Sequence, residues 1–345
     1  MMSFQVVSSR LKLRKLITVH GNITSLYLKN KYMEVKNTEI IIIGAGIAGV
    51  SAAVYAKRSG LDFVLCEEKA VGGQLLLMEK IDNYIGLGLG LKGWDLANNL
   101  DKTLSELGIP VVSGKITDSV INESASKVDV MIEGVTYEAK GCIVATGAAF
   151  EKLGVKGEAE FSGKGVSYCA VCDGFFFRDK NVAVVGGGNT AVEEAMYLSG
   201  IAKKVTLIHR RDKLRALDYL QKEMAQKDNI EVVYNSVVEE INGSRILEKI
   251  SLKNVADNQR QELIIDGLFV AVGVKPNTEQ FKGKLSMDEK GFIITNEEMQ
   301  ASSKLIWAAG DCRRRPLRQL ITAASEGAIA SMGAYKYLKG RYVSV

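Results

Sequence analysis

Two segments of the chain show the same succession of apolar, small and amphipathic positions. The first begins with the apolar run Ile40 to Ile43, continues through the glycine-rich turn Gly44 to Gly49, and then has a helical pattern over 50–59. A short apolar run without alternation is typical of a buried strand in a parallel sheet. A second strand is predicted over 62–66, directly before Glu67. This segment therefore predicts a complete unit of strand, helix and strand.

The same unit occurs again in the middle of the chain. An apolar strand is predicted over 182–185, a turn from Gly186 to Ala191, a helix over 192–198, and a further strand over 205–208. A glycine-rich turn between a strand and a helix is the phosphate-binding part of a dinucleotide-binding fold. Two copies at this separation predict two dinucleotide sites and hence two α/β domains.

The remaining apolar runs indicate how these two domains share the chain. Runs ending in Ala145-Thr146-Gly147 and in Val272-Gly273 mark two points where the chain leaves one domain and later returns to it. We therefore expect an α/β fold with two Rossmann-like domains, the second inserted into the first. The predicted boundaries are a leader at 1–36, a first domain at 37–150 and 275–345, and an inserted domain at 151–274. Further predicted elements are meander strands at 111–112 and 128–132, strands at 142–145, 231–234, 250–252, 267–272 and 305–309, and a final helix at 320–338.

Composition and charge narrow the classes of function. The chain has 345 residues, 47% of them hydrophobic and 25% charged, as expected for a globular protein of two domains. The chain has a net charge of +5, and its basic residues are interleaved with acidic ones almost everywhere after residue 37, which predicts no nucleic-acid surface; no long uncharged run predicts a membrane span. Residues 1–36 carry seven Lys or Arg and one acid, Glu34. Three interpretations of this leader remain open: a basic extension or a start upstream of the natural initiator Met33, an organellar transit peptide, and a functional basic arm.

The residues after the second strand of each unit predict which dinucleotide is bound. In the first unit, glycines let the backbone approach a pyrophosphate, and Glu67 can accept hydrogen bonds from both hydroxyls of an unmodified ribose, as in FAD and NAD. The second unit has arginines there, and their guanidinium groups bind a 2′-phosphate, which favours NADPH unless they only form a solvated helix start. Together the two sites predict a flavoprotein that takes hydride from NADPH. The residues predicted to bind NADPH are Gly186, Gly188, Asn189, Thr190, His209, Arg210, Arg211 and Arg215.

Between the two turns lies a cysteine pair, Cys169 and Cys172, followed by Asp173. Its spacing suits a small disulfide and thiol-disulfide exchange. A zinc site and an inert buried pair are the alternatives, but zinc needs four ligands, and the chain has two His and no second pair of this kind. Asp173 either moves protons to and from the thiolates or caps a helix, and its residue type does not decide between these roles. The other cysteines lie in or next to apolar runs and favour a reducing, cytoplasmic compartment: Cys66, Cys142 and Cys312.

In order and spacing, these motifs resemble the low-molecular-weight thioredoxin reductases, which are class II pyridine nucleotide-disulfide oxidoreductases. The resemblance covers essentially everything after residue 37. The motifs that carry it are Gly44-Ala45-Gly46-Ile47-Ala48-Gly49, Gly72-Gly73-Gln74-Leu75, Asn83, Ala145-Thr146-Gly147, Cys169-Ala170-Val171-Cys172-Asp173-Gly174, Gly186-Gly187-Gly188-Asn189, His209-Arg210-Arg211, Gly273-Val274-Lys275-Pro276-Asn277-Thr278, Gly310-Asp311 and Arg318-Gln319.

The resemblance implies an NADPH-dependent thioredoxin-disulfide reductase. Electrons pass from NADPH to FAD, to the Cys169 and Cys172 pair, and then to thioredoxin or a thioredoxin-like protein. It further implies that Cys172 lies nearest the flavin, that Asp173 is the acid, that the inserted domain rotates about segments near residues 151 and 275 during turnover, and that the protein is a homodimer. The residues implied to bind FAD are Gly44, Gly46, Gly49, Glu67, Gly73, Gln74, Asn83, Thr146, Gly147, Gly310, Asp311, Arg318 and Gln319.

The chain departs from the family pattern in a few places. Ile85 stands where a proline is usual, and Cys312 stands where a small apolar residue is usual and is interpreted as a packed thiol. Arg313 to Arg315 form either a solvated loop or a docking site for an acidic partner. The alternative functions are a flavoprotein NADPH oxidase, a ferredoxin-NADP reductase-like enzyme, and a flavin-binding regulator without catalysis. The cysteine pair argues against all three.

Overall fold

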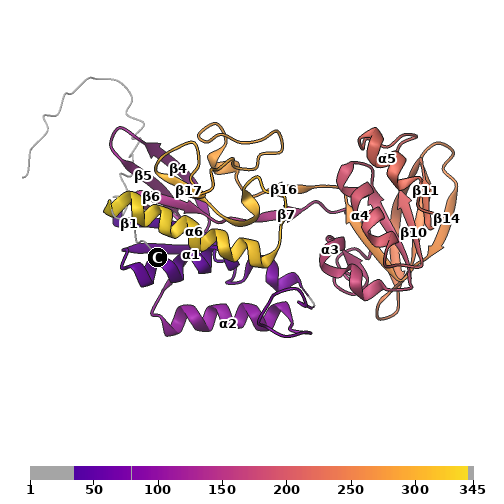
Figure 1. Ribbon diagram of the computed structural model, residues 1–345, viewed down its shortest axis with the longest axis horizontal. Coiled ribbons are helices and arrows are strands. Elements are labelled where there is room, and N and C mark those ends of the chain that lie inside the picture. The colour runs from indigo at the N-terminus through magenta and orange to yellow at the C-terminus, as the bar shows by residue number, and fades with distance from the viewer. Residues whose placement is uncertain (1–34, 79, 341–345) are drawn as a thin grey trace, which may run out of the picture. The chain divides into compact units, whose positions relative to one another are not determined.

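The computed structural model describes residues 35–78 and 80–340. The interpretations of the basic leader, including Met33 as the initiator, lie outside these residues. Within them, the chain forms a mixed sheet of seven strands, a parallel sheet of five strands, a three-stranded antiparallel sheet and a two-stranded ribbon (Figure 1). The predicted α/β fold class with two nucleotide-binding sheets is confirmed.

The first sheet is built from both ends of the described chain. Its strand order is β3-β2-β1-β6-β5-β4, and β17 also pairs with β6. The first half of β6 pairs antiparallel with β5, and its last residues pair parallel with β17. A strand near the C-terminus therefore completes a sheet that begins near the N-terminus. The elements are β1 (Val35–Ile43), α1 (Ile47–Ser59), β2 (Phe63–Glu67), η1 (Gly73–Leu77), α2 (Gly93–Glu106), β3 (Val111–Ser113), β4 (Ile116–Asn122), β5 (Lys127–Ile132), β6 (Val135–Val144), β17 (Ile306–Ala308), η4 (Gly310–Cys312) and α6 (Leu320–Lys339).

Both faces of the first sheet are covered, which explains the unbroken apolar run in β1. Ile40 to Ile43 are at most 3% exposed, and burying each such side chain stabilises the fold by about 1.5–3 kcal/mol. The helices α1 and α6 lie side by side on one face of the sheet (Figure 1). Their close approach depends on small residues: a Cβ at Gly327 of α6 would lie 2.0 Å from the carbonyl oxygen of Ala48 in α1.

The second sheet has five parallel strands in the order β11-β10-β9-β15-β8. The helix α4 covers one face through its buried residues Ala191, Val192, Ala195 and Leu198. The antiparallel sheet β12-β13-β14 packs on the other face in a separate apolar cluster. The elements are β8 (Val166–Ser167), α3 (Ala170–Asp173), η2 (Gly174–Phe177), β9 (Asn181–Gly186), α4 (Asn189–Ser199), β10 (Lys204–Ile208), α5 (Asp218–Met224), β11 (Ile230–Val233), β12 (Ser236–Gly243), β13 (Leu247–Asn254), β14 (Arg260–Ile264) and β15 (Gly267–Ala271).

A two-stranded antiparallel ribbon lies at the two predicted crossing points. The strand β7 (Ala148–Phe150) pairs with β16 (Val274–Pro276), so that Phe150 faces Val274 and Ala148 faces Pro276. Every strand of the second sheet lies in the chain between β7 and β16, and the short helix η3 (Glu279–Phe281) follows β16. We retain 151–274 as the proposed extent of the inserted domain.

Two predicted details are corrected by the structure. The strand β3 is not part of the meander, because it pairs parallel with β2 at the edge of the first sheet. Both nucleotide-site helices begin three residues earlier than predicted, at Ile47 and Asn189, directly after the N-cap glycines Gly46 and Gly188. The residues of each turn that follow the N-cap glycine already have helical conformation, which the apolar pattern could not indicate.

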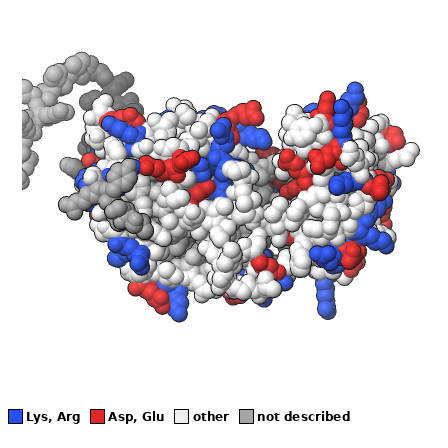
Figure 2. Space-filling model, viewed as in Figure 1, with Lys and Arg blue, Asp and Glu red and all other residues white. Residues whose placement is uncertain are grey.

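The charge of the described residues is balanced over short distances. On the face shown in Figure 2, acidic and basic side chains are interspersed and do not gather into one basic patch. Long-range attraction of a polyanion is therefore not expected from this face. In residues 35–78 and 80–340, no helix is both long enough and apolar enough to cross a membrane.

We expect Gly327→Ala to lower the free energy of unfolding by about 1–3 kcal/mol, because the added methyl group has to push α6 away from α1. Gly200→Ala is a matched control, since Gly200 has a φ of −76° and a new Cβ there would meet its nearest neighbour at 3.5 Å. Chemical denaturation followed by circular dichroism compares the two variants. Equal stability of both would contradict the tight contact between the helices.

Candidate active site

Cys169 and Cys172 form a disulfide at the start of the short helix α3, with their Cα atoms 5.3 Å apart. Cys169 is the N-cap of α3, and the backbone N–H of Cys172 donates to the Cys169 sulfur at 3.2 Å. A backbone donor of this kind stabilises negative charge on a sulfur. The zinc alternative finds no support, because no group of three or more His, Cys, Asp and Glu residues in the described chain could hold a metal.

Asp173 is held in place by a serine that the sequence reasoning missed. The Ser167 hydroxyl donates to Asp173 Oδ2 at 2.5 Å, and its oxygen accepts the backbone N–H of Cys169 at 3.1 Å. Asp173 is the last residue of α3, and its side chain makes no capping bond to the following helix η2. The helix-cap interpretation of Asp173 is therefore wrong, and its carboxylate is directed to a residue that also contacts the cysteine pair.

Two residues predicted for the flavin site lie next to the disulfide. Gln319 Nε2 is 3.6 Å from the Cys172 sulfur, and Gln319 Oε1 accepts a hydrogen bond from Asn83 Nδ2 at 3.0 Å. Gln319 is the N-cap of α6 and forms a capping box with Thr322, which fixes its side chain. The structure therefore brings Cys172, Gln319 and Asn83 together although they are far apart in the sequence.

The first glycine-rich turn has the geometry of a dinucleotide site. Gly44 has a φ of +100°, and a Cβ there would lie 2.4 Å from the Ala145 carbonyl oxygen. The helix α1 has no side-chain cap at Gly46 and no acid in its first turn, so its N-terminus can receive a phosphate. Glu67 Oε2 accepts the backbone N–H of Ala45 at 2.7 Å, which places this carboxylate beside the turn.

The segment containing Gly73 and Gln74 lies beside this turn. Gly72, the residue before Gly73, donates its backbone N–H to the Ala45 carbonyl oxygen at 2.8 Å. Gln74 Nε2 donates to the carbonyl oxygen of Ala148, the first residue of β7, two positions after Thr146. The predicted residues from three separate motifs therefore surround the same strand ends.

Buried polar atoms without partners indicate where a ligand fits. Within the described residues, Thr146 Oγ1, Asp311 Oδ1 and Arg318 Nε are buried and make no hydrogen bond. Burial raises the pKa of Asp311, against the lowering effect of the nearby Arg315 and Arg318 guanidinium groups. Unsatisfied buried groups are costly, and the polar ribityl chain and pyrophosphate of FAD have the donors and acceptors to satisfy them. The residues present therefore fit FAD.

The Arg313 to Arg315 segment is neither a solvated loop nor a docking site as a whole. Arg313 and Arg315 donate to the two carboxylate oxygens of Glu326 at 2.5 and 3.1 Å, and Arg315 is 7% exposed. Only Arg314 is exposed. Glu326 Oε2 also accepts the backbone N–H of Gly310 at 2.8 Å. This charge network therefore holds the backbone of Gly310, which belongs to the predicted flavin site, in place.

Cys312 is a packed thiol, as interpreted from the sequence. It is fully buried, and its sulfur donates to the carbonyl oxygens of Val144 and Ala309, both at 3.3 Å. Burial, together with the neighbouring Asp311 carboxylate, raises the pKa of this thiol to about 11. At neutral pH the thiol is therefore protonated and a poor nucleophile.

The second glycine-rich turn is followed by uncompensated positive charge. Gly188 caps α4 without a side-chain bond, and the backbone N–H of Arg215 donates to the Gly187 carbonyl oxygen at 2.7 Å. The guanidinium groups of Arg210, Arg211 and Arg215 are in exposed residues and form no ion pair with any described residue. These groups and the free first turn of α4 fit a phosphorylated dinucleotide such as NADPH.

The other residues predicted for this second site support the turn. Gly186 ends β9, and Asn189 and Thr190 are the first residues of α4. Asn189 Oδ1 accepts the backbone N–H of Leu217 at 3.0 Å. His209 is 4% exposed beneath Gly187, and its Nε2 lies 3.0 Å from the Lys213 carbonyl oxygen. Burial lowers the pKa of His209, so its imidazole is a neutral support for the turn and not a phosphate-binding cation.

Glu194 of α4 is a second carboxyl group near the cysteine pair that the sequence reasoning missed. It faces the backbone N–H of Ala170, the first residue of α3, and its Oε2 is buried without a hydrogen bond. Burial, with a contribution from the Glu193 carboxylate, raises the pKa of Glu194 to about 7. Neither Glu194 nor Ser167 belongs to a motif, so only the packing of α3 against α4 and β8 could reveal them.

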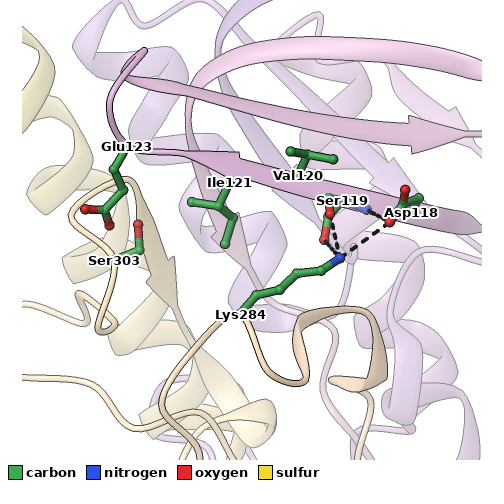
Figure 3. Close-up of a pocket in the computed structure, with 7 residues that line it drawn as sticks. All are labelled: Asp118, Ser119, Val120, Ile121, Glu123, Lys284 and Ser303. Carbon is green, nitrogen blue, oxygen red and sulfur yellow. Dashed lines mark hydrogen bonds and ion pairs between the residues drawn. The ribbon is translucent and has the colours of Figure 1, made fainter.

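A surface pocket lies beside β4, away from all of these residues. Figure 3 shows Lys284 reaching across it to Ser119 and Asp118. Lys284 Nζ donates to the Ser119 carbonyl oxygen at 2.5 Å and lies 3.4 Å from Asp118 Oδ1. The lysine is therefore engaged in tying the segment after η3 to β4, and the pocket contains none of the predicted site residues.

Comparison with known proteins is consistent with this site. The family model for pyridine nucleotide-disulphide oxidoreductases matches residues 38–327. A thioredoxin reductase of Peptoclostridium acidaminophilum is 40% identical over 311 residues, which are 88% of this chain and 98% of that protein. A solved thioredoxin reductase of Streptococcus pyogenes is 41% identical, with a TM-score of 0.85, over 88% of this chain and 99% of that one.

A second solved relative superimposes less well at similar identity. The thioredoxin reductase of Lactococcus lactis, described as being in the FR conformation, is 37% identical over 88% of this chain and all of that chain, with a TM-score of 0.59. Identity and coverage of this extent establish a common family in spite of the lower score. The chain therefore belongs to the pyridine nucleotide-disulphide oxidoreductases and, within them, to the thioredoxin reductase family.

Proposed function

We propose that the protein is an NADPH-dependent flavoprotein disulfide reductase that reduces thioredoxin or a thioredoxin-like protein through its Cys169 and Cys172 pair. The observation that carries this proposal is the contact of the Cys172 sulfur with Gln319, which joins the redox disulfide to residues that fit FAD. The flavoprotein oxidase, the ferredoxin-NADP reductase-like enzyme and the regulator do not account for this disulfide.

The residues around the first glycine-rich turn hold FAD, which supplies two-electron transfer between NADPH and a disulfide. The N-terminus of α1 binds the pyrophosphate, and Glu67 accepts hydrogen bonds from the ribose hydroxyls. Asp311, Thr146 and Arg318 provide buried polar atoms that make no hydrogen bond to the described residues. The hydrogen bond from the Gly310 N–H to Glu326 keeps the Gly310 backbone, next to Asp311, in place.

The second turn binds NADPH. The N-terminus of α4 receives its pyrophosphate, and Arg210, Arg211 and Arg215 bind the 2′-phosphate that distinguishes NADPH from NADH. Among the described residues, these guanidinium groups have no carboxylate partner, which supports this role. Their positive charge is then not neutralised within the protein and is available to attract a phosphate.

Reduction of the disulfide to one thiol and one thiolate requires two electrons, which NADPH supplies, and one proton. The bond between the two sulfurs breaks, and Asp173 gives a proton to one of the resulting thiolates. The remaining thiolate attacks the disulfide of the partner protein, forms a mixed disulfide and releases one partner thiolate. The second cysteine then returns its proton to Asp173 and attacks the mixed disulfide, which restores the Cys169 and Cys172 bond and releases the second partner sulfur as a thiolate; the partner thiolates take up protons from water.

The NADPH residues and the cysteine pair belong to the same inserted domain. The nicotinamide and the disulfide therefore cannot both contact the same flavin in a single arrangement of the two domains. We propose that this domain, 151–274, rotates about the ribbon of β7 and β16. The different superposition of two relatives with 41% and 37% identity, at TM-scores of 0.85 and 0.59, supports more than one arrangement within the family.

Two further features of the protein are proposed from the family and from its cysteines. The thioredoxin reductase resemblance supports a homodimer. A reducing, cytoplasmic location is supported by Cys66, Cys142 and Cys312, which are unpaired thiols in the described chain. Sedimentation velocity of the FAD-loaded protein would establish its oligomeric state.

Cys172→Ser should abolish disulfide reduction, with a loss of at least about 100-fold in rate, because the exchange needs both sulfurs. Reduction of the bound flavin by NADPH should remain, since Cys172 takes no part in that step. Stopped-flow absorbance of the flavin and an NADPH-coupled thioredoxin assay measure the two steps separately. Retained thioredoxin reduction in this variant would rule out the dithiol route.

Arg210→Ala combined with Arg211→Ala should weaken NADPH far more than NADH, by about 10- to 100-fold in kcat/KM, because two phosphate contacts are lost. Arg245→Ala removes an exposed positive charge from the turn between β12 and β13 and is the matched control. Steady-state kinetics with both nucleotides give the ratio. Equal losses for NADPH and NADH would contradict the phosphate assignment.

A further inference from the structure

The environment of Asp173 poses a problem for an acid that gives up and regains a proton in each cycle. A carboxyl group changes from hydrogen-bond donor to acceptor when it loses its proton. A fixed donor beside the oxygen that takes up the proton suits only the ionised form, and a fixed acceptor there suits only the protonated form. Asp173 has such a neighbour in the hydroxyl of Ser167, which lies 2.5 Å from Asp173 Oδ2.

Ser167 has a second acceptor for its hydrogen. Its Oγ lies 3.4 Å from the carbonyl oxygen of Cys169 in addition to the 2.5 Å contact with Asp173 Oδ2. A hydroxyl has one donor and two acceptor sites, and its hydrogen rotates freely between partners. One acceptor site of Ser167 is already occupied by the backbone N–H of Cys169 at 3.1 Å. The other is available to a proton on Asp173.

We propose that Ser167 is a positioning residue for the reaction, because its hydroxyl holds Asp173 beside the cysteine pair in both protonation states. With Asp173 ionised, the Ser167 hydrogen points to Asp173 Oδ2. When Asp173 carries a proton, that proton points to Ser167 Oγ, and the Ser167 hydrogen turns to the Cys169 carbonyl oxygen. No heavy atom has to move between the two states, which differ by the one proton that Asp173 gives up or regains and by the rotation of the Ser167 hydroxyl.

The position of Ser167 makes it a rigid support. It is 5% exposed and ends β8, which pairs parallel with β15 at the edge of the second sheet. Its backbone is therefore fixed by the sheet, whereas α3 is a helix of only four residues. The Ser167 hydroxyl, carried by β8, can thus fix both Asp173 at the end of α3 and the N-cap residue Cys169 at its start. This inference rests on the proposed disulfide reductase function.

The test is a double-mutant cycle with Ser167→Ala, Asp173→Asn and both substitutions together, in the FAD-loaded full chain. The readouts are the rate of thioredoxin disulfide reduction and the rate of flavin reduction by NADPH. We expect Ser167→Ala to lower the first rate about tenfold or more and to leave the second unchanged. In the Asp173→Asn background, Ser167→Ala should cost less than threefold, because a residue that acts through Asp173 has nothing left to position.

Two variants separate this role from a general loss of structure. Ser167→Thr keeps the hydroxyl on a strand position that accepts a β-branched residue, and it should restore the rate to within about threefold. Ser236→Ala removes another buried serine hydroxyl, at the start of β12 and bonded to the Tyr234 carbonyl oxygen, and should leave the rate unchanged at a comparable loss of thermal stability.

Two results would overturn the proposal. One is that Ser167→Ala lowers the rate of disulfide reduction as much in the Asp173→Asn background as in the wild type. The other is that Ser167→Ala alone reduces the disulfide at the wild-type rate. If Ser167→Thr does not fold, the cycle of the other variants still decides. A wild-type protein that does not reduce a thioredoxin disulfide with NADPH would instead refute the proposed function, so the two failures are distinguishable.

Discussion

The flavin side of the molecule depends on one steric constraint, which is the close approach of bare backbone at the first glycine-rich turn. The Gly44 backbone is in contact with Ala145 at the end of β6, and a Cβ at Gly49 would lie 1.7 Å from the Gly44 carbonyl oxygen. Strand, turn and helix can therefore meet only if these positions have no side chain. The same tight packing directs the free N-terminus of α1 and the carboxylate of Glu67 to one place.

Burial of charge is the second condition for this site. Glu326 compensates two arginines that are largely removed from water and holds the Gly310 backbone. Such a network does not stabilise the fold strongly by itself, because its desolvation cost offsets most of the Coulomb attraction. Its effect is to fix the backbone that carries Asp311. The remaining unsatisfied atoms, such as Thr146 Oγ1, are matched to a cofactor and not to the protein.

The cysteine pair is organised differently from the nucleotide turns. A four-residue helix has too few internal hydrogen bonds to be rigid, so its geometry is imposed from outside. Ser167 holds it from the sheet of its own domain, and Gln319 contacts it from α6. The first contact lies within the proposed inserted domain and would be kept if that domain rotates as proposed. The second would form in only one of the proposed arrangements.

The sequence by itself determined the α/β fold, the two nucleotide turns, the cysteine pair and the packed state of Cys312, because each has a local signature of period, glycine spacing or apolar surroundings. It did not determine that β3 is an edge strand, that Arg313 and Arg315 pair with Glu326, or that Ser167 and Glu194 face α3. These facts depend on which residues distant in sequence come into contact. An isolated Ser, Glu or Arg has the same local pattern whether it is solvated or buried against a partner, so only the tertiary structure decided their roles.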